Sequence, residues 1–309
     1  MNHLKVSVIV PNYNHAPYLR QRLDSIYNQT FQDFEVIILD DCSTDNSKEI
    51  IEEYRNRPQT SHIVYNEVNS GSPFKQWAKG LNLAQGEFIW IAESDDYCKT
   101  IFLAKTVTKL QESESSAFVY SNSILIDPQN QVLDTKDIAE NIPNGLINGK
   151  QFIFNFMYKE NSVWNASAVV FRKKQALQIN KDFTLLKAAG DYLFWIKLAE
   201  LGNVFHLGER LNYFRQHLQK VTPTMTKTGI LHTEELIIVT YLASHIKLSL
   251  PKMIHTYCSH LWKIQDTSYL TKETEKKILQ AWKENNKALY YISLTLISFK
   301  RKIDVLLSH

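Results

Sequence analysis

The first hundred residues alternate between short apolar runs and longer stretches with the periodicity of a helix. Residues 6–10, 34–39 and 88–92 are compact runs rich in β-branched and aromatic side chains, which is typical of buried strands. Residues 16–28 and 74–84 lie between such runs and repeat apolar side chains at helical spacing. Because parallel strands are joined by crossover helices, this alternation predicts an α/β fold with a parallel sheet covered on both faces.

Residues 99–228 show a less regular pattern. Residues 191–201 favour a helix that ends at Gly202, where glycine commonly follows a helix. Residues 204–207 and 211–214 resemble two separate short strands. Residues 99–228 are therefore expected to extend the α/β domain, with shorter and less evenly spaced elements.

The C-terminal part of the chain has a different pattern. Residues 231–248, 252–265 and 272–299 all favour helix. There is no internal repeat and no low-complexity linker before them. We therefore expect a first domain over residues 1–228 and a helical region over residues 229–309 that packs onto it.

The composition indicates a folded protein with a sizeable core. Of 309 residues, 44% are hydrophobic and 22% are charged, which excludes a disordered chain, a collagen-like repeat and a coiled coil. The formal net charge is +3, from 35 basic and 32 acidic residues. This excess is too small to indicate nucleic acid as the partner.

The cysteines and the N-terminal segment bear on the compartment. Cys42, Cys98 and Cys258 match no metal or redox spacing. Residues 1–5 lead directly into the first predicted strand, which leaves no room for a signal peptide, and no apolar run reaches about 18 residues. We therefore expect a reducing, cytoplasmic location and no membrane-spanning helix.

Polar side chains follow three of the predicted strands. They form the segments Asn12-Tyr13-Asn14, Asp40-Asp41 and Glu93-Ser94-Asp95-Asp96. Each segment alone is typical of a turn or a helix N-cap. In an open parallel sheet, however, ligands bind outside the carboxyl ends of the strands, so three such segments at one edge indicate a ligand site.

The adjacent carboxylates Asp95 and Asp96 carry the clearest chemical signal. Two neighbouring negative charges repel each other unless a cation or a hydrogen-bond donor offsets them. Such a pair can hold a hard divalent cation through one side chain and a ribose hydroxyl through the other. The spacing fits Mg²⁺ or Mn²⁺ and no zinc, haem or iron–sulfur pattern.

As an ordered set, these segments resemble a known enzyme family. Residues 6–14, 40–45 and 87–96 are similar to the nucleotide-sugar half of a family 2 glycosyltransferase with the GT-A fold. Residues 190–195 resemble the acceptor-side motif that carries the catalytic base in inverting members. The similarity extends over about residues 4–220.

The resemblance implies a domain plan and an activity. The fold would be a Rossmann-like, mostly parallel sheet flanked by helices, with a nucleotide-binding half over residues 1–98, an acceptor-binding half over 99–228 and a helical extension over 229–309. The enzyme would move a sugar from a nucleotide-diphosphate donor to a hydroxyl of a glycan or lipid-linked acceptor. It would do so by one inverting displacement assisted by a divalent metal.

The resemblance also implies which residues bind the nucleotide. Pro11, Tyr13 and Asn14 would line the base and ribose pocket. Asp41 would accept a hydrogen bond from a pyrimidine N3–H, which favours UDP or dTDP over a purine donor. Asp95 would face the ribose or the sugar.

The resemblance also implies which residues bind the metal, act as the base and contact the acceptor. Asp96 would ligate the metal that bridges the diphosphate, and Asp191 would be the general base. His217 lies in a weaker match, and both a metal or phosphate contact and a surface role stay open for it. The acceptor side would include three further residues: Glu93, Trp164 and Asn165.

Two departures from the family pattern change these expectations. Many relatives place an Arg-Asn pair where this chain has Trp77-Ala78, so neutralisation of the diphosphate falls to Lys75, Lys79 or Arg215, with the choice left open. The base motif is often an acidic pair. Here Gly190 replaces its first member and leaves Asp191 as its one carboxylate.

Other hypotheses remain beside the leading one. A non-catalytic module that retains the nucleotide-sugar pocket is the main alternative. A sugar nucleotidyltransferase ranks lower, because it would carry a Gly-rich basic loop after the first strand, where this chain has residues 11–15. The apolar and basic residues 288–307 fit either a helix packed on its own domain or peripheral contact with an anionic inner membrane surface.

Overall fold

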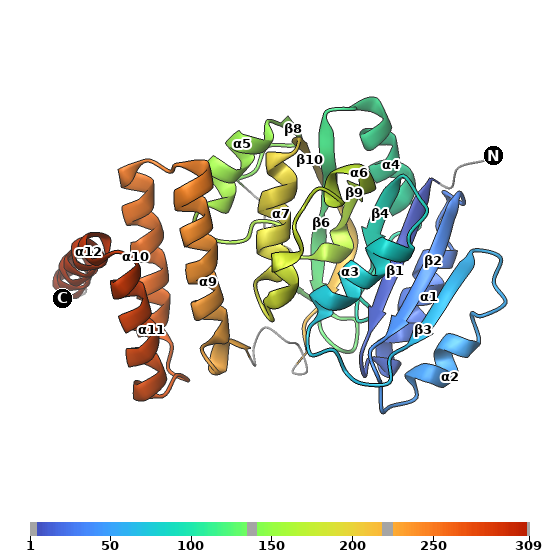
Figure 1. The fold of residues 1–309 in the computed structure, drawn as a ribbon, viewed down its shortest axis with the longest axis horizontal. Helices are drawn as coiled ribbons and strands as arrows, with labels where there is room; N and C mark the ends of the chain where they lie inside the picture. The colour runs from blue at the N-terminus through green and yellow to red at the C-terminus, as the bar shows by residue number, and fades with distance from the viewer. Residues whose placement is uncertain (1–4, 135–140, 218–224, 308–309) are drawn as a thin grey trace.

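The computed structural model describes residues 5–134, 141–217 and 225–307, which form one sheet flanked by helices and a set of C-terminal helices (Figure 1). The strands are β1 Val6–Asn12, β2 Phe34–Asp40, β3 Thr60–Tyr65, β4 Phe88–Ile91, β5 Tyr97–Cys98, β6 Ser116–Ile126, β7 Val132–Asp134, β8 Gly145–Ile147, β9 Val169–Arg172 and β10 Asn203–Arg215. The helices of the sheet domain are α1 Ala16–Tyr27, α2 Ser47–Glu52, α3 Pro73–Leu83, α4 Phe102–Glu112, α5 Gly149–Phe152, α6 Lys173–Ala176 and α7 Gly190–Glu200.

The strands follow the order β3-β2-β1-β4-β9-β6-β10-β5, with β7 beside β6 and β8 beside β10. The long pairings are parallel: β1 with β2 and β4, β2 with β3, and β6 with β10. Shorter antiparallel pairings join β9 to β4 and β6, and β5 to β10. The predicted α/β fold with a mostly parallel central sheet is confirmed.

Alternating side chains of the strands face opposite sides of the sheet, and each side has its own core. Val8 and Val10 of β1 pack with α1, α2 and α4, whereas Ile9 between them packs with α3 and α7. Every residue of β1 and β2 is buried. This explains why these strands are almost continuously apolar rather than alternating.

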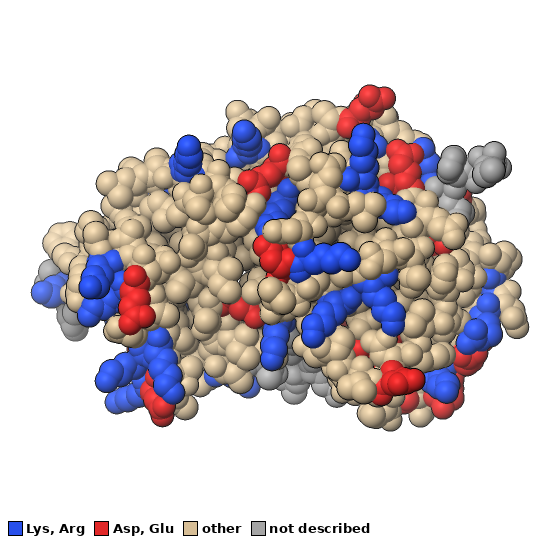
Figure 2. Space-filling view, in the orientation of Figure 1, with Lys and Arg blue, Asp and Glu red and all other residues tan. Residues whose placement is uncertain are grey.

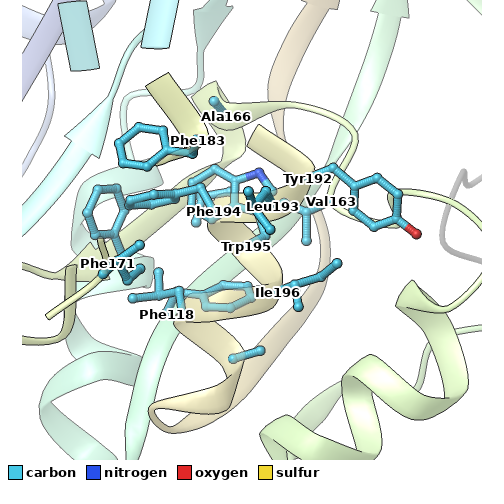
Figure 3. Packing of buried hydrophobic residues seen from close by; sticks show 14 of the residues in the cluster. Phe118, Val163, Ala166, Phe171, Phe183, Tyr192, Leu193, Phe194, Trp195 and Ile196 are labelled. Carbon is cyan, nitrogen blue, oxygen red and sulfur yellow. The ribbon is translucent and has the colours of Figure 1, made fainter. Parts of the chain in front are cut away.

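Helix α7 is surrounded by aromatic side chains (Figure 3). Phe194 lies 5.0 Å from Phe183 and 5.4 Å from Phe171 between ring centroids, and Trp195 lies 5.8 Å from Phe118. Edge-to-face and tilted contacts of this kind are favourable beyond the area they bury. The packing fixes the position of α7 and therefore of the residues at its N-terminal end.

The prediction of two separate short strands over 204–207 and 211–214 was wrong, because the two segments belong to one strand. One strand, β10, covers the whole stretch and pairs with β6. The register shifts between Leu207 and Arg210, which is the signature of a bulge. The bulge accommodates the polar residues that interrupted the apolar pattern.

The C-terminal helices are α9 Ile230–Tyr241, α10 Leu250–Asp266, α11 Lys272–Asn285 and α12 Lys287–Leu307. The prediction of a single helix over 272–299 was wrong, because Asn286 adopts an extended conformation between α11 and α12. The Asn286 side chain accepts a hydrogen bond from the backbone N–H of Leu289 and so caps α12. Figure 1 shows α9 beside α7 and α12 at the far end of the molecule.

None of the helices in the described part of the chain combines the length and the apolar character that crossing a bilayer requires. On the face drawn in Figure 2, lysines and arginines are interspersed with acidic residues over the sheet domain. This mixed distribution agrees with the small net charge of the sequence.

Candidate active site

An open cavity of about 380 Å³ lies at the carboxyl ends of β1 and β4, between the sheet, α3 and the start of α7. Its lining includes Pro11, Tyr13, Asp41, Glu93, Asp95, Asp96, Trp164, Asn165 and Asp191, all named from the sequence. It also includes residues to which the sequence analysis gave no role in the site, among them Asn12, His15, Gln76, Trp77 and Lys187. The structure therefore brings together acidic side chains that are about 150 residues apart in the chain.

The carboxylate of Asp41 is held in a fixed orientation just after β2. Its Oδ1 accepts hydrogen bonds from Asn66 Nδ2 at 2.6 Å, from the backbone N–H of Ser70 at 2.9 Å and from Gln76 Nε2 at 2.8 Å. Its Oδ2 accepts one from the Ser70 hydroxyl at 2.7 Å. The cluster of donors fixes the orientation of the carboxylate, and Asp41 lines the cavity.

Two buried acceptor oxygens in the cavity wall have no hydrogen-bond partner among the described residues. They are Asn12 Oδ1 and Gln76 Oε1. Buried polar atoms are nearly always paired, so these oxygens are suited to donors on a bound ligand. A polar residue at a buried position of α3, next to Trp77, is the sequence signal that could have identified Gln76.

Asn14 does not line the cavity but joins the loops after β1 and β2. It has a left-handed backbone conformation, with φ of 55°, which asparagine tolerates better than most residues. Its backbone N–H donates to Ser43 Oγ and its side-chain oxygen accepts from the backbone N–H of Thr44. The expected contact with the nucleotide is therefore supported by position for Pro11 and Tyr13, while Asn14 supports their loop.

The two carboxylates after β4 have different surroundings. Asp96 Oδ1 accepts from the backbone N–H of Arg215 at 2.9 Å, and its Oδ2 accepts from Asn165 Nδ2 at 2.8 Å. Asp95 Oδ2 lies 2.9 Å from His217 Nε2. Asp96 is thus anchored by two protein donors, whereas Asp95 is the carboxylate beside the histidine.

Arg215 is fully buried and does not line the cavity. Its guanidinium donates to the backbone oxygens of Asp95 and Asp127 and to the side chains of Gln21 and Asn130. These contacts occupy its donors within the protein. The expectation that Arg215 contacts the diphosphate is corrected: this residue holds the turn that carries the two carboxylates.

Lys75 and Lys79 also make protein contacts outside the cavity lining. Lys75 donates to the backbone oxygen of Ser70, Lys79 donates to Asn66, and neither residue lines the cavity. Of the lysines and arginines that the structure describes, Lys187 is the one in the cavity lining. It lies in an irregular segment before α7, where hydrophobic periodicity gives no signal.

A candidate metal site lies beside the two carboxylates. The ligand atoms of His15, Asp95 and His217 all lie within 4.8 Å of one another. His217 Nδ1 is buried and lacks a hydrogen-bond partner in the described structure. One carboxylate and two imidazoles fit a divalent cation, and of the two expected ions they favour Mn²⁺ over Mg²⁺, which prefers oxygen ligands. This group contains His217, for which a metal contact was one of the open roles, but Asp95 takes the place expected for Asp96.

Asp191 lies in the first turn of α7 and faces the cavity. Its Oδ2 accepts a hydrogen bond from Asn161 Nδ2 at 2.9 Å. Burial raises the pKa of Asp191 to about 7, and the charge of Glu234 acts in the same direction, against the hydrogen bonds that lower it. A carboxylate with this pKa is well suited to accept a proton near neutral pH.

Gly190 precedes Asp191 because no larger side chain fits. A Cβ at this position would lie 2.4 Å from the ring of Phe74 and 2.6 Å from the backbone oxygen of Phe183. Both distances are far below van der Waals contact. The absence of a second acid from the motif therefore has a steric reason.

Glu93, expected on the acceptor side, lines the cavity in a strongly perturbed environment. Its carboxyl accepts a hydrogen bond from the indole N–H of Trp77 at 2.9 Å. Burial, followed by the charge of Asp95, raises the pKa of Glu93 to about 8. Trp164 lines the same cavity with half of its surface exposed, and Asn165 is engaged by Asp96 as described above.

Comparison with known proteins agrees with the motifs. The model of glycosyl transferase family 2 matches residues 7–127. This segment of the chain resembles a family 2 glycosyltransferase domain. The matched segment contains β1 to β4 and both acidic turns of the cavity.

Curated relatives of this domain include two poly(ribitol-phosphate) transferases. The β-N-acetylglucosaminyltransferase TarS of Staphylococcus aureus (strain Mu50) is 38% identical over 118 residues, which cover 38% of this chain and 20% of TarS. A poly(ribitol-phosphate) β-glucosyltransferase of Bacillus spizizenii is 33% identical over 114 residues, which cover 36% of this chain and 18% of that protein. The chain thus spans about a fifth of the length of these relatives.

Solved structures confirm the fold over nearly the whole chain. The structure of S. aureus TarS 1–349 in complex with UDP-GlcNAc superposes with a TM-score of 0.62 at 20% identity, covering 96% of this chain and 92% of that one. The mannosyltransferase PcManGT of Pyrobaculum calidifontis, in complex with GDP-Man and Mn²⁺, gives a TM-score of 0.54 at 17% identity, covering 95% and 83%. The chain therefore has the GT-A fold, with the C-terminal helices included in the superposition.

Proposed function

We propose that this chain transfers a sugar from a pyrimidine nucleoside diphosphate to a hydroxyl of a glycan or lipid-linked acceptor. The observation that carries the proposal is the single cavity that joins Asp41, the Glu93–Asp96 turn and Asp191. We assign residues 1–98 to nucleotide binding, 99–228 to acceptor binding and 229–309 to a helical extension.

The donor side of the proposal rests on Asp41 and its neighbours. Asp41 Oδ2 accepts a hydrogen bond from the Ser70 hydroxyl and faces a cavity whose wall also offers Asn12 Oδ1 and Gln76 Oε1. These acceptors suit the N3–H of uracil or thymine and the ribose hydroxyls. The TarS structure with UDP-GlcNAc supports a UDP-sugar as the first donor to test, and dTDP presents the same N3–H.

The diphosphate side requires positive charge near the acidic turn. His15, Asp95 and His217 would hold Mn²⁺ or Mg²⁺, and the bound ion supplies charge that offsets the negative charge developing on the leaving diphosphate. We assign the diphosphate contact to Lys187, and not to the basic residues proposed from the sequence, because its position in the cavity lining suits a phosphate contact. Asp96, anchored by Asn165, keeps the turn in place.

The acceptor side supplies the base. An acceptor hydroxyl has a pKa far above neutral, so its proton must be taken as the oxygen attacks the anomeric carbon. Asp191 accepts that proton, while the bond to the diphosphate breaks through an oxocarbenium-like state. One displacement with one base inverts the anomeric centre. We assign Glu93 and Trp164, which line the same cavity, to acceptor binding.

The helical extension offers a surface for peripheral membrane contact. The outward face of α12 exposes Ile292, Leu296, Phe299 and Ile303, which recur at intervals of four, three and four residues. The exposed basic segment 300–302 follows directly. An apolar stripe beside basic residues is suited to an anionic lipid surface, where a lipid-linked acceptor would be found.

The transfer proposal is tested by incubating the purified protein with Mn²⁺ and a panel of UDP-, dTDP- and GDP-sugars and measuring release of the nucleoside diphosphate. We expect turnover with a UDP- or dTDP-sugar, slow without acceptor, and its loss in Asp191→Asn. Saturable nucleotide binding without any turnover would instead support the non-catalytic module. Turnover limited to a purine donor would contradict the assignment of Asp41.

A further inference from the structure

Glu234 of α9 binds the segment that leads into the helix of the proposed base. Its side chain is 7% exposed. Its Oε1 accepts the backbone N–H of Lys187 at 2.8 Å, and its Oε2 accepts those of Ala188 and Ala189 at 2.8 and 2.9 Å. One carboxylate from the C-terminal helices thus satisfies three consecutive amides of the sheet domain.

These three amides lie between the cavity and the start of α7. Lys187 and Ala188 line the cavity, and Ala189 is the N-cap of α7. N–H groups before and within the first turn of a helix lack partners in the helix itself. A carboxylate placed there pairs them and interacts favourably with the positive end of the helix dipole. Asp191 follows only two residues after the last of these amides.

Helix α9 is itself held firmly against α7. Ile238 and Leu242 pack in the same core as α7, and the Tyr241 hydroxyl donates to Glu200 at the opposite end of α7. On its other side α9 contacts α10 and α11, where the Trp282 indole donates to the backbone oxygen of His232. Glu234 is therefore presented from a rigid element rather than from a loop.

The position of Glu234 also bears on the missing member of the acidic pair. Phe74 and the backbone of Phe183 exclude any side chain at position 190. The second carboxylate near Asp191 comes instead from α9, and it acts on Asp191 electrostatically. The C-terminal helices thus contribute a group that the matched family segment, residues 7–127, does not contain.

We propose that Glu234 is a positioning residue of the transferase: it fixes the segment 187–191, so that Lys187 and Asp191 face the cavity. This inference rests on the proposed function of Asp191. It makes the region beyond residue 229 a part of the active site and not a detachable appendage.

The first test measures positioning without any turnover. Amide hydrogen exchange of residues 187–189 is compared in wild type, Glu234→Gln, Glu234→Ala and the control Tyr241→Phe. A hydrogen bond to a charged acceptor protects strongly, so Glu234→Ala should speed exchange at these amides by about tenfold or more. Tyr241→Phe removes a contact at the far end of the same helix pair and should leave these amides unchanged. Unchanged exchange in Glu234→Ala would overturn the proposal.

The second test separates positioning from general loosening of the fold. Glu234→Ala should lower kcat by about 10²-fold with the donor KM nearly unchanged, because small displacements of a reacting group have effects of this size. The charged residues around Asp191 are Glu234 from α9, Lys187 from the same segment and, across the cavity, Glu93, Asp95 and Asp96. Loss of one negative charge in Glu234→Gln should move the acid limb of kcat/KM to lower pH.

The outcomes distinguish this inference from the proposed function. If wild type transfers no sugar, the proposed function fails, and the exchange measurement still decides whether Glu234 holds the segment. If wild type is active and Tyr241→Phe loses as much kcat as Glu234→Ala, or if the pH profile of Glu234→Gln equals that of wild type, Glu234 has only a structural role.

Discussion

At the scale of single residues, the site depends on how each carboxylate is surrounded. Asp41 is fixed by neutral donors, Asp96 by a backbone amide and an asparagine, and Asp191 by burial at the start of α7. Residue type and order predicted that these side chains belong to one site. The partners could not be predicted, because each comes from a distant segment whose register depends on the complete fold.

The pH dependence of transfer should follow the ionisation of Asp191. Burial raises its pKa to about 7, so below that value the carboxyl is protonated and cannot accept the acceptor's proton. We expect kcat/KM to fall about tenfold per pH unit below pH 7 and to level off above it. In Asp191→Asn the acid limb should vanish and kcat should fall about 10²- to 10⁴-fold. A pH-rate profile that is flat between pH 5 and 8 in wild type would contradict this role.

Replacing Arg215 or Lys187 by methionine should distinguish a residue that stabilises the fold from a residue that binds the donor. Arg215→Met leaves several buried acceptors unpaired and should lower the free energy of unfolding by about 3 kcal/mol. Lys187→Met changes an exposed side chain, so we expect a change below about 0.5 kcal/mol but a raised donor KM. Denaturant unfolding and donor kinetics check both. A stable Arg215→Met that binds donor poorly would restore the original expectation for Arg215.

At the scale of elements, hydrophobic periodicity predicted the strands β1, β2 and β4 and the helices between them. It failed where polar residues interrupt the apolar pattern: a bulge joins two predicted strands into β10, and Asn286 divides one predicted helix into α11 and α12. The close packing of α3 against α7 could not be predicted either. In the sequence, Gly190 only marks the loss of an acidic residue, and nothing there shows that it packs against Phe74.

This close packing gives a prediction for α7. Gly190→Ala places a methyl group against Phe74 and the backbone of Phe183, so it should lower the free energy of unfolding by about 2 kcal/mol. Gly208→Ala is the matched control, because the nearest atom to its Cβ lies at 3.6 Å. Thermal and denaturant unfolding compare the two variants. Equal stability of both would show that α3 and α7 are less closely packed than described.

At the scale of the whole molecule, α9 of the C-terminal helices contacts the sheet domain at the segment that leads into α7. The order of the motifs predicted the fold, because the strands, the acidic turns and the helix that carries Asp191 follow one another as they do in the family that the sequence resembles. The contribution of α9 could not be predicted, because Glu234 lies outside every motif and contacts the site only through backbone amides.

The outer face of α12 gives a prediction for the intact chain. The wild-type protein should sediment with vesicles that contain anionic lipid and remain in solution with neutral vesicles. Phe299→Glu should weaken this binding by about tenfold or more, since it removes a large apolar group from the stripe. Val68→Glu changes a more exposed apolar residue on the sheet domain and should have no effect. Sedimentation that is absent, or the same in both variants, would contradict membrane contact.

The central claim is that side chains distant in the sequence form one donor site with a divalent cation. Calorimetric titration with UDP, in the presence and absence of Mn²⁺, tests this most directly. We expect saturable binding that needs Mn²⁺ and weakens at least about tenfold in Asp95→Asn, which removes a ligand from the candidate metal site. Binding that is equally strong without Mn²⁺, unchanged in Asp95→Asn or tighter for GDP than for UDP would contradict the account.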